Sequence, residues 1–288
     1  MARERLRLSS GLHSLDYKIN WGFTPGLLEV VGHGASGKTS LAYAIARQAD
    51  KEGYVATLIQ TKSHAYPSYV MGAGPPDLVY VNPASGEAAI EAAYVAVVAG
   101  CKVVLLDALP ATLPNSILRG TLSERQTSAQ YKMLFHGLTA IKRAAQSRGS
   151  LIVIINELRW KGQGGGVDSY MQEGVMDIAD HRIKLIRDGY VTSYGRLKEV
   201  DIIVQVTQMR GALCKIETTA KIIPKFGFDS GRNLVQALQE VGATRRRGAY
   251  WITNEGDKLG PGYVEAADEA RFNEDYYRVI LEETCQRS

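Results

Sequence analysis

Residues 32–39 have the types and the spacing needed to hold the phosphates of a nucleotide. They match the pattern G-x-x-x-x-G-K-[ST] and lie between an apolar run and a helical pattern. Glycines let backbone N–H groups curl around phosphate oxygens, while the helix start and the Lys38 ammonium add positive charge. The Thr39 hydroxyl is suited to Mg²⁺. The alternative is a glycine-rich turn with a chance lysine, which the flanking elements disfavour. The residues predicted to bind ATP here are Gly32, His33, Gly34, Ala35, Ser36, Gly37, Lys38, Thr39 and Ser40.

A second feature is an apolar run, residues 102–106, that ends in the carboxylate of Asp107. An Asp at the carboxyl end of a parallel strand faces the same crevice as a phosphate-binding loop, where it can hold the water shell of Mg²⁺. In isolation, an Asp that caps the following turn would be the favoured interpretation. Beside residues 32–39 a metal role is favoured, so Thr39 and Asp107 are the predicted metal residues.

The composition sets limits on the class of protein. With 288 residues, 45% of them hydrophobic, the chain can bury one substantial core and a small second one. Its 34 Lys plus Arg against 30 Asp plus Glu leave a net charge of only +4, so any DNA site must be a local patch. The three cysteines share no metal-ligand spacing, and an odd number suits a reducing compartment. With neither a signal-peptide pattern nor a spanning apolar run, we expect a cytoplasmic protein without membrane contact.

Short apolar runs alternate with helical patterns, which predicts an α/β fold with a mostly parallel central sheet flanked by helices. After residue 180 alternating segments predict antiparallel strands that extend the sheet. A polar helix, a Gly-rich turn and one acidic helix at 268–283 then predict a small C-terminal α/β domain. The predicted strands are 27–31, 55–59, 78–81, 103–106, 151–155, 182–186, 200–208 and 212–217, and the predicted helices include 39–51, 86–99 and 128–146. The expected division is a short N-terminal arm (1–10), an ATPase core (11–230) and the C-terminal domain (231–288).

Several further segments carry a resemblance over nearly the whole chain. They are residues 10–16 (SGLHSLD), 67–72, Asn82-Pro83, Gly86-Glu87, 155–159 (INELR), 248–251 (GAYW) and 256–262 (GDKLGPG). In order and spacing these segments resemble the RecA recombinase family, with Ala179-Asp180 similar to phage members of the UvsX type. A phosphate-binding loop alone would leave many ATPase families open. The succession of segments therefore carries the inference of a RecA-like recombinase.

The resemblance implies that Tyr69 lies against adenine and that residues 120–127 and 159–173 are two DNA-binding loops. The alternatives are a core tyrosine and ordinary solvated loops. The second loop holds the glycine-rich stretch 161–166, which is too flexible to pack alone. Its basic and aromatic residues suit a single strand. The implied DNA contacts are Arg119, Arg125, Arg159, Trp160, Lys161, Gly164 and Gly165.

Two positions depart from the family pattern. Lys62 stands where RecA proteins have the glutamate that activates water, and a protonated lysine cannot accept a proton, although it could neutralise phosphate charge. Glu157 stands where the family has a glutamine that senses the γ-phosphate. One hypothesis is that Lys62 and Glu157 form an ion pair and Glu157 activates the water. The other is a site that binds ATP and turns it over very slowly. Lys38, Glu157 and Lys62 are the candidate catalytic residues.

The subunit contacts of the family are also expected to differ. Family members dock on a neighbour through an N-terminal helix and strand, for which the eleven residues before Leu12 leave almost no room. Residues 1–8 could still add one basic strand to a neighbouring subunit's sheet, a contact that generates an open helix. Lys215 and Lys221 fall roughly where family members send lysines to the neighbour's ATP. Both could equally be solvated charges at a strand edge. We expect self-association into a helical filament or a ring.

The densest positive patch is Arg245, Arg246 and Arg247, followed by the aromatic residues Tyr250 and Trp251. Adjacent arginines can each meet a phosphate, so this patch is a candidate site for duplex DNA, while the aromatic pair could be domain core.

Three functions stay open. The first is an ATP-dependent recombinase that forms filaments on single-stranded DNA and promotes homologous pairing and strand exchange. The second is a RecA-like accessory or annealing protein with little or no hydrolysis, and the third is a RecA-fold ATPase that does not act on DNA. DNA-stimulated release of phosphate separates the first from the other two.

Overall fold

A large mixed sheet runs through the computed structural model, which describes residues 6–62, 73–120, 127–160, 167–169 and 171–287. The strand order is β10-β9-β8-β7-β1-β5-β4-β2-β3, with β6 (Val167–Ser169) paired to the end of β5. The parallel part contains β1 (Gly26–Gly32), β2 (Ala56–Gln60), β3 (Val79–Val81), β4 (Val103–Asp107), β5 (Leu151–Trp160) and the start of β7 (His181–Ser193). The antiparallel extension adds β8 (Arg196–Met209), β9 (Ala212–Ile223) and β10 (Gly227–Phe228). The predicted α/β class is confirmed.

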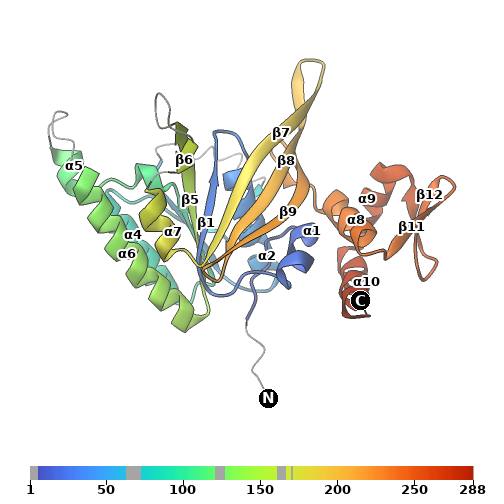
Figure 1. Ribbon diagram of the computed structural model, residues 1–288, viewed down its shortest axis with the longest axis horizontal. Coiled ribbons are helices and arrows are strands. Elements are labelled where there is room, and N and C mark those ends of the chain that lie inside the picture. Colours follow the sequence, from blue (N-terminus) through green and yellow to red (C-terminus); the bar gives the residue numbers. More distant parts are fainter. Residues whose placement is uncertain (1–5, 63–72, 121–126, 161–166, 170, 288) are drawn as a thin grey trace.

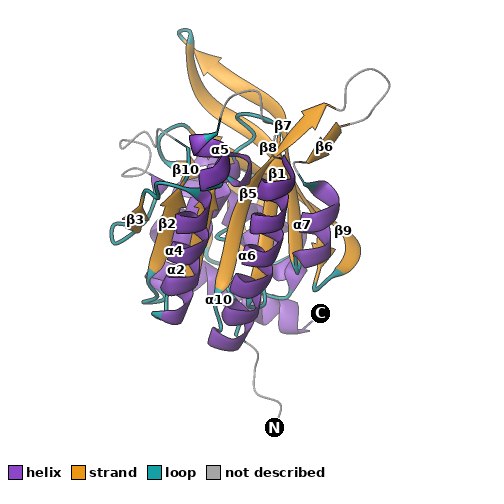
Figure 2. Cartoon of the chain, turned by 90° about the vertical axis from the view of Figure 1, so that its left-hand side faces the viewer, coloured by secondary structure: helices purple, strands orange, loops and turns teal. Residues whose placement is uncertain are grey.

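Helices cover both faces of this sheet, with α2 over one core and α4 and α6 over the other. Figure 2 shows α4 and α6 side by side on their face. Consecutive residues of a strand point to opposite faces, and here both faces are buried. On β4, Leu105 belongs to the core under α2, whereas Val104 belongs to the core under α4 and α6. This double burial explains the unbroken apolar runs of the sequence. The helices are α1 (His13–Asp16), α2 (Lys38–Lys51), α4 (Gly86–Val98), α5 (Asn115–Arg119), α6 (Thr127–Arg148) and α7 (Gln172–Ile178), with 3-10 turns η1 (Tyr17–Ile19) and η2 (Leu109–Ala111).

The hairpin of β7 and β8 is longer than the sequence pattern indicates. Near His181 buried and half-buried residues alternate, but residues 187–198 are nearly all exposed. Figures 1 and 2 show this part of the hairpin rising beyond the body of the protein. Without a core on one side it has no alternation to detect, which is why the sequence predicts this strand only as far as residue 186.

The C-terminal part forms a third core of its own, visible at the right of Figure 1. Its elements are α8 (Ser230–Glu240), β11 (Thr244–Arg247), β12 (Tyr250–Thr253), β13 (Lys258–Pro261), α9 (Gly262–Phe272) and α10 (Glu274–Arg287). The prediction of one acidic helix over 268–283 is wrong, because the chain leaves helical geometry at Asn273 and two helices result. Tyr17 and Trp21 also pack against this core, so it is joined to the N-terminal part of the chain.

At the N-terminus, Leu8 is paired with Phe23 of its own chain through two backbone hydrogen bonds. Its side chain is 1% exposed in the main core. The expectation that residues 1–8 reach a neighbouring subunit as one strand is therefore wrong for Leu8, which is held internally; residues 1–5 lie outside the described part. Among the described residues, none of the helices is both long and apolar enough to cross a membrane.

Candidate nucleotide-binding site

The loop between β1 and α2 has the shape of a phosphate cradle. Gly37 has φ +87°, a conformation that favours glycine, and a Cβ there would lie 2.4 Å from Ile222 Cδ1. A Cβ at Gly32 would lie 2.3 Å from Ser36 Oγ. The Lys38 ammonium donates hydrogen bonds to the carbonyl oxygens of Gly32 (3.0 Å) and His33 (2.6 Å). The motif glycines are thus required by the local backbone, and the lysine head group lies against the loop.

Thr39 and Asp107 lie side by side at the carboxyl ends of the strands. The Thr39 hydroxyl donates to Asp107 Oδ2 at 3.0 Å. Burial raises the pKa of the Asp107 carboxyl, while the Thr39 bond and then the Lys62 and Lys38 charges oppose that rise. A hydroxyl and a carboxylate fit Mg²⁺, which keeps several waters and uses few protein ligands beside phosphate oxygens. No cluster of three or more His, Cys, Asp or Glu that could hold a metal occurs in the described segments.

The two departures from the family pattern are in direct contact. Lys62 follows β2 and Glu157 lies in β5, 95 residues apart, and their Nζ and Oε1 atoms are 2.6 Å apart. The hypothesised ion pair is therefore present. Both side chains are partly exposed, at 41% and 34%, so each can reach a ligand.

The four charged side chains Lys38, Lys62, Asp107 and Glu157 form one electrostatic group. Burial lowers the pKa of Lys38; Glu157 raises that pKa, Lys62 lowers it, and Asp107 raises it. Two cations and two carboxylates at the ends of adjacent strands can bind phosphate, hold a hard cation and orient a water.

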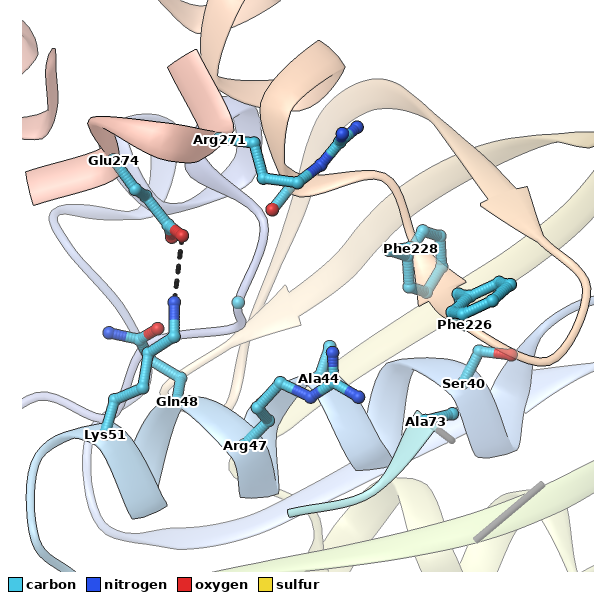
Figure 3. A pocket seen from close by; sticks show the side chains of 13 residues that line it. Ser40, Ala44, Arg47, Gln48, Lys51, Ala73, Phe226, Phe228, Arg271 and Glu274 are labelled. Carbon is cyan, nitrogen blue, oxygen red and sulfur yellow. Dashed lines mark hydrogen bonds and ion pairs between the residues drawn. The ribbon is translucent and has the colours of Figure 1, made fainter. Parts of the chain in front are cut away.

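A cavity of about 240 Å³ lies along α2, between Ser40 and Lys51, and Figure 3 shows its lining. Ser40, the residue after Thr39, stands at one end beside Ala73, Phe226 and Phe228. Phe226 is 66% exposed, so its ring is accessible to a ligand in the cavity. Neither phenylalanine is among the residues predicted from the sequence. The only trace of them in the sequence is the order Phe-Gly-Phe at residues 226–228, and no hydrophobic periodicity distinguishes this turn from others.

The residues predicted to contact single-stranded DNA are only partly placed. Arg119 is exposed at the end of α5, and Figure 1 shows α5 and β6 at the same end of the molecule. The backbone of Arg159 and Trp160 forms the end of β5, paired with β6. Tyr69, Arg125, Lys161, Gly164 and Gly165 lie outside the described residues.

The remaining predicted residues lie elsewhere. Lys221 Nζ is 2.5 Å from Asp201 Oδ1 and 3.4 Å from Glu199 Oε2, and the hydrogen bond to Asp201 is the main cause that raises its pKa. It is thus held within its own chain, whereas Lys215 on β9 is exposed. The side chains of Arg245, Arg246 and Arg247 are exposed on β11. Figure 1 places β11 at the opposite end of the molecule from α5, so these arginines are remote from Arg119.

A glycine-rich loop between a central parallel strand and a helix, with a carboxylate on a nearby strand, defines a P-loop nucleotide-binding fold. The RecA N-terminal domain family matches residues 4–167, more than half of the chain. The chain therefore belongs to the RecA family, an ATP-binding family.

Similar proteins extend this match toward the C-terminus. Protein RecA of Chloroherpeton thalassium is 28% identical over 292 residues, covering 94% of this chain and 80% of that protein. Protein RecA of Acidothermus cellulolyticus is 26% identical over 93% of this chain and 80% of that protein. Protein RecA of Bifidobacterium breve is 25% identical over 88% of this chain and 67% of that protein.

Proposed function

We propose that this chain is an ATP-dependent DNA recombinase that forms filaments on single-stranded DNA and promotes homologous pairing and strand exchange. The observation that carries the proposal is the convergence of Lys38, Thr39 and Asp107 with the Lys62–Glu157 pair at one edge of the sheet. Family membership supports it. A cytoplasmic location remains part of the proposal.

Each residue of the site has a proposed role. Lys38 and the loop N–H groups hold the terminal phosphates, and Thr39 and Asp107 hold Mg²⁺, which supplies charge neutralisation when bound. Glu157 accepts the proton of the attacking water. Lys62 orients the Glu157 carboxylate until the γ-phosphate draws the lysine away.

The nucleoside is proposed to lie in the cavity beside Ser40. There an aromatic face at Phe226 contributes stacking and the small side chain of Ala73 leaves room for a base. Tyr69, implied by the resemblance as an adenine contact, lies outside the described part of the chain and stays a prediction. The proposal thus assigns both ends of ATP to this chain.

The proposed DNA contacts are the segments around Arg119 and Arg159 for a single strand and the β11 arginines for a duplex. Strand β5 carries Glu157 of the nucleotide site and ends at Arg159 and Trp160, so one strand bears residues of both proposed sites. Lys215 and Lys221 remain the proposed contacts to a neighbouring subunit's nucleotide. Lys221 would have to exchange its bond to Asp201 for one to phosphate.

The test is phosphate release measured with and without a single-stranded oligonucleotide. The recombinase proposal expects turnover that rises when the oligonucleotide is added, together with ATP-dependent filaments in electron micrographs. Equal turnover in both samples would contradict it.

A second function is favoured by one contact, the 2.6 Å approach of Lys62 to Glu157. If this bond persists when ATP is bound, the carboxylate stays engaged and the protein is a RecA-like accessory or annealing protein with little hydrolysis. Tight ATP and DNA binding with negligible phosphate release would identify it. Negligible DNA binding would instead identify a RecA-fold ATPase that does not act on DNA.

A further inference from the structure

Gln60 is a polar residue buried at the carboxyl end of β2. It is 5% exposed, and among the described residues its Oε1 is one of the buried side-chain atoms for which the chain supplies no hydrogen-bond partner. A buried carbonyl oxygen of this kind costs free energy, because it has exchanged its hydrogen bonds to water for none. An amide with no packing advantage over an apolar residue therefore requires an explanation beyond the core.

The Gln60 side chain lies on the face of the sheet that carries the nucleotide site. Gln60 and Asp107 are partners in the parallel register of β2 and β4. Side chains alternate along a strand, so these two share the face of Leu58 and Leu105, which belong to the core under α2. Asp107 accepts from Thr39, the second residue of α2, in agreement with this assignment. Gln60 is thus the neighbour of the Thr39–Asp107 pair on β2.

The residue after Gln60 fixes the end of β2 to the residues that follow β4. The Thr61 backbone N–H donates to the Asp107 carbonyl oxygen at 2.8 Å. The Thr61 hydroxyl donates to the Ala108 carbonyl oxygen at 2.9 Å and accepts from the Ala108 N–H at 3.0 Å. The Thr112 hydroxyl, 1% exposed as a residue, donates to the same carbonyl at 3.1 Å. These bonds hold Gln60 and Asp107 in one relative position, as a ligand shared by both requires.

The chemistry of Gln60 Oε1 limits what it can bind. It is an acceptor, so its partner must be a hydrogen-bond donor or a cation. Mg²⁺ keeps several of its waters in protein sites, and each of those waters is a donor. The Lys38 ammonium is another donor of this region, but it already donates to two carbonyl oxygens of the phosphate loop. A hydrated cation is therefore the partner that fits Gln60 best.

We propose that the side-chain carbonyl of Gln60 accepts a hydrogen bond from a water bound to Mg²⁺, as a third residue of the metal shell beside Thr39 and Asp107. This inference rests on the proposed function, which assigns Mg²⁺ to those two residues. An amide orients the hydrated ion without adding charge, whereas a carboxylate at position 60 would lie beside Asp107 and be repelled by it. Gln60 thus contributes to metal binding through its acceptor atom alone.

A purely structural role leads to a different expectation. If Gln60 only fills space, leucine can replace it and also removes the unpaired carbonyl. On either interpretation Gln60→Leu should therefore unfold at or above the wild-type temperature when metal and nucleotide are absent. Only the metal-shell role expects this variant to lose affinity for nucleotide in the presence of Mg²⁺.

The principal experiment measures the affinity of a non-hydrolysable ATP analogue in Mg²⁺ and in EDTA. Gln60→Leu should weaken binding about 2- to 12-fold in Mg²⁺, the effect of one hydrogen bond, and by less than about 2-fold in EDTA. Thr57→Val is the matched control. Thr57 is also a buried polar residue of β2, near the amino end of the strand, and its hydroxyl donates to Cys101 Sγ at 3.2 Å. This control should have the wild-type affinity in both solutions.

Gln60→Glu is the complementary variant, because it keeps the acceptor atom and adds a negative charge. Without metal it should unfold below the wild-type temperature, since its carboxylate lies beside Asp107. Added Mg²⁺ should raise its unfolding temperature by more than it raises that of the wild type, because the ion binds the folded state more tightly. Its affinity for the analogue in Mg²⁺ should equal or exceed the wild-type affinity.

The outcomes separate this inference from the proposed function. Wild-type affinity of Gln60→Leu in Mg²⁺ overturns the inference alone, as does an equal loss in Mg²⁺ and in EDTA. A Gln60→Glu protein that responds to Mg²⁺ no more than the wild type also overturns it, even if Gln60→Leu does not fold. A wild-type protein that binds the analogue equally in Mg²⁺ and in EDTA overturns the metal role in the proposed function, and the inference with it.

Discussion

The nucleotide site has two halves that differ in how they are built. In the first half, Lys38, Thr39 and the loop glycines come from one short segment, and only Asp107 is brought from elsewhere. In the second half, Lys62 and Glu157 come from strands separated by β4 and meet only because the sheet places β2 and β5 on either side of it. The first half keeps the usual residues of a P-loop, whereas the second has a lysine in place of the family's glutamate and a glutamate in place of its glutamine.

This difference shows that a paired change can preserve the number of carboxylates in a site. A glutamate-to-lysine change at position 62 alone would remove a carboxylate, and a glutamine-to-glutamate change at 157 alone would add one. Together they leave one carboxylate, moved from the end of β2 to β5 and held by a lysine. The two halves can therefore be tested separately, because substitutions in the first should affect ATP binding and substitutions in the second should affect turnover.

The largest effect is expected for Glu157→Gln. If Glu157 is the base, turnover should fall by roughly 10²- to 10⁴-fold while ATP affinity stays near its wild-type value. Single-turnover phosphate release and equilibrium nucleotide binding measure the two quantities. Tighter ATP binding with little loss of a small rate would instead assign the protein to the non-hydrolysing alternative.

Lys38→Ala should act on the first half. Removing one or more charge-assisted hydrogen bonds to phosphate, each worth about 1.5–3 kcal/mol, should weaken ATP binding at least 10- to 150-fold and abolish ATP-dependent assembly. Filaments that still form with ATP would contradict the role of nucleotide as the switch. Lys102→Ala is a suitable control. Lys102 precedes β4 and so lies at the opposite end of that strand from Asp107, and its Nζ donates to the backbone carbonyl of Arg148.

A double-mutant cycle sharpens the second half. Lys62→Glu alone should be poor, because it places two carboxylates together, whereas Lys62→Glu with Glu157→Gln should exceed either single variant in turnover. The expected interaction is about 0.5–3 kcal/mol, typical of residues that touch. Additive effects would mean that the two side chains do not act on one reaction.

Phe226→Ala should have a smaller effect at the nucleoside end. Removing one aromatic stack of about 0.5–1.5 kcal/mol predicts a 2- to 12-fold rise in the dissociation constant for ATP. Inorganic triphosphate, which lacks a base, should bind both proteins equally. Phe272→Ala, another exposed phenylalanine, serves as the control. An equal loss of triphosphate affinity would place Phe226 outside the base pocket.

The smallest expected change is in salt dependence. Replacing Arg159 and Lys161 with Ala should flatten the logarithmic dependence of single-strand affinity on salt by about 0.7 for each phosphate that the protein no longer neutralises. The same measurement on an Arg245→Ala, Arg247→Ala variant should leave single-strand binding unchanged, because β11 lies at the other end of the molecule. An unchanged slope for the first variant would move the single-strand site away from β5.

The sequence predicted the strands of the parallel sheet to within a few residues at most boundaries. Both faces of the central strands β1, β2 and β4 are buried, so their apolar runs are unbroken. It predicted the loop at residues 32–39 for a related reason, since the cradle depends on glycines within one segment. It failed over the acidic helix, where a charge pattern hid the break at Asn273. The exposed half of the hairpin escaped because no core lies against it.

By itself, then, the sequence determined the features that depend on near neighbours: the phosphate loop, the periodicity of the strands and the identity of the exchanged residues at 62 and 157. Only the tertiary structure decided which distant residues meet. Glu29 is visible in the sequence as one charge in an apolar run, but its partners at Asn156 and Arg182 depend on the strand order that puts β1 between β5 and β7. Phe226 likewise gains a role only because the β9–β10 turn and Ser40 of α2 line the same cavity. Contacts of this kind follow from sheet order, which no local pattern encodes.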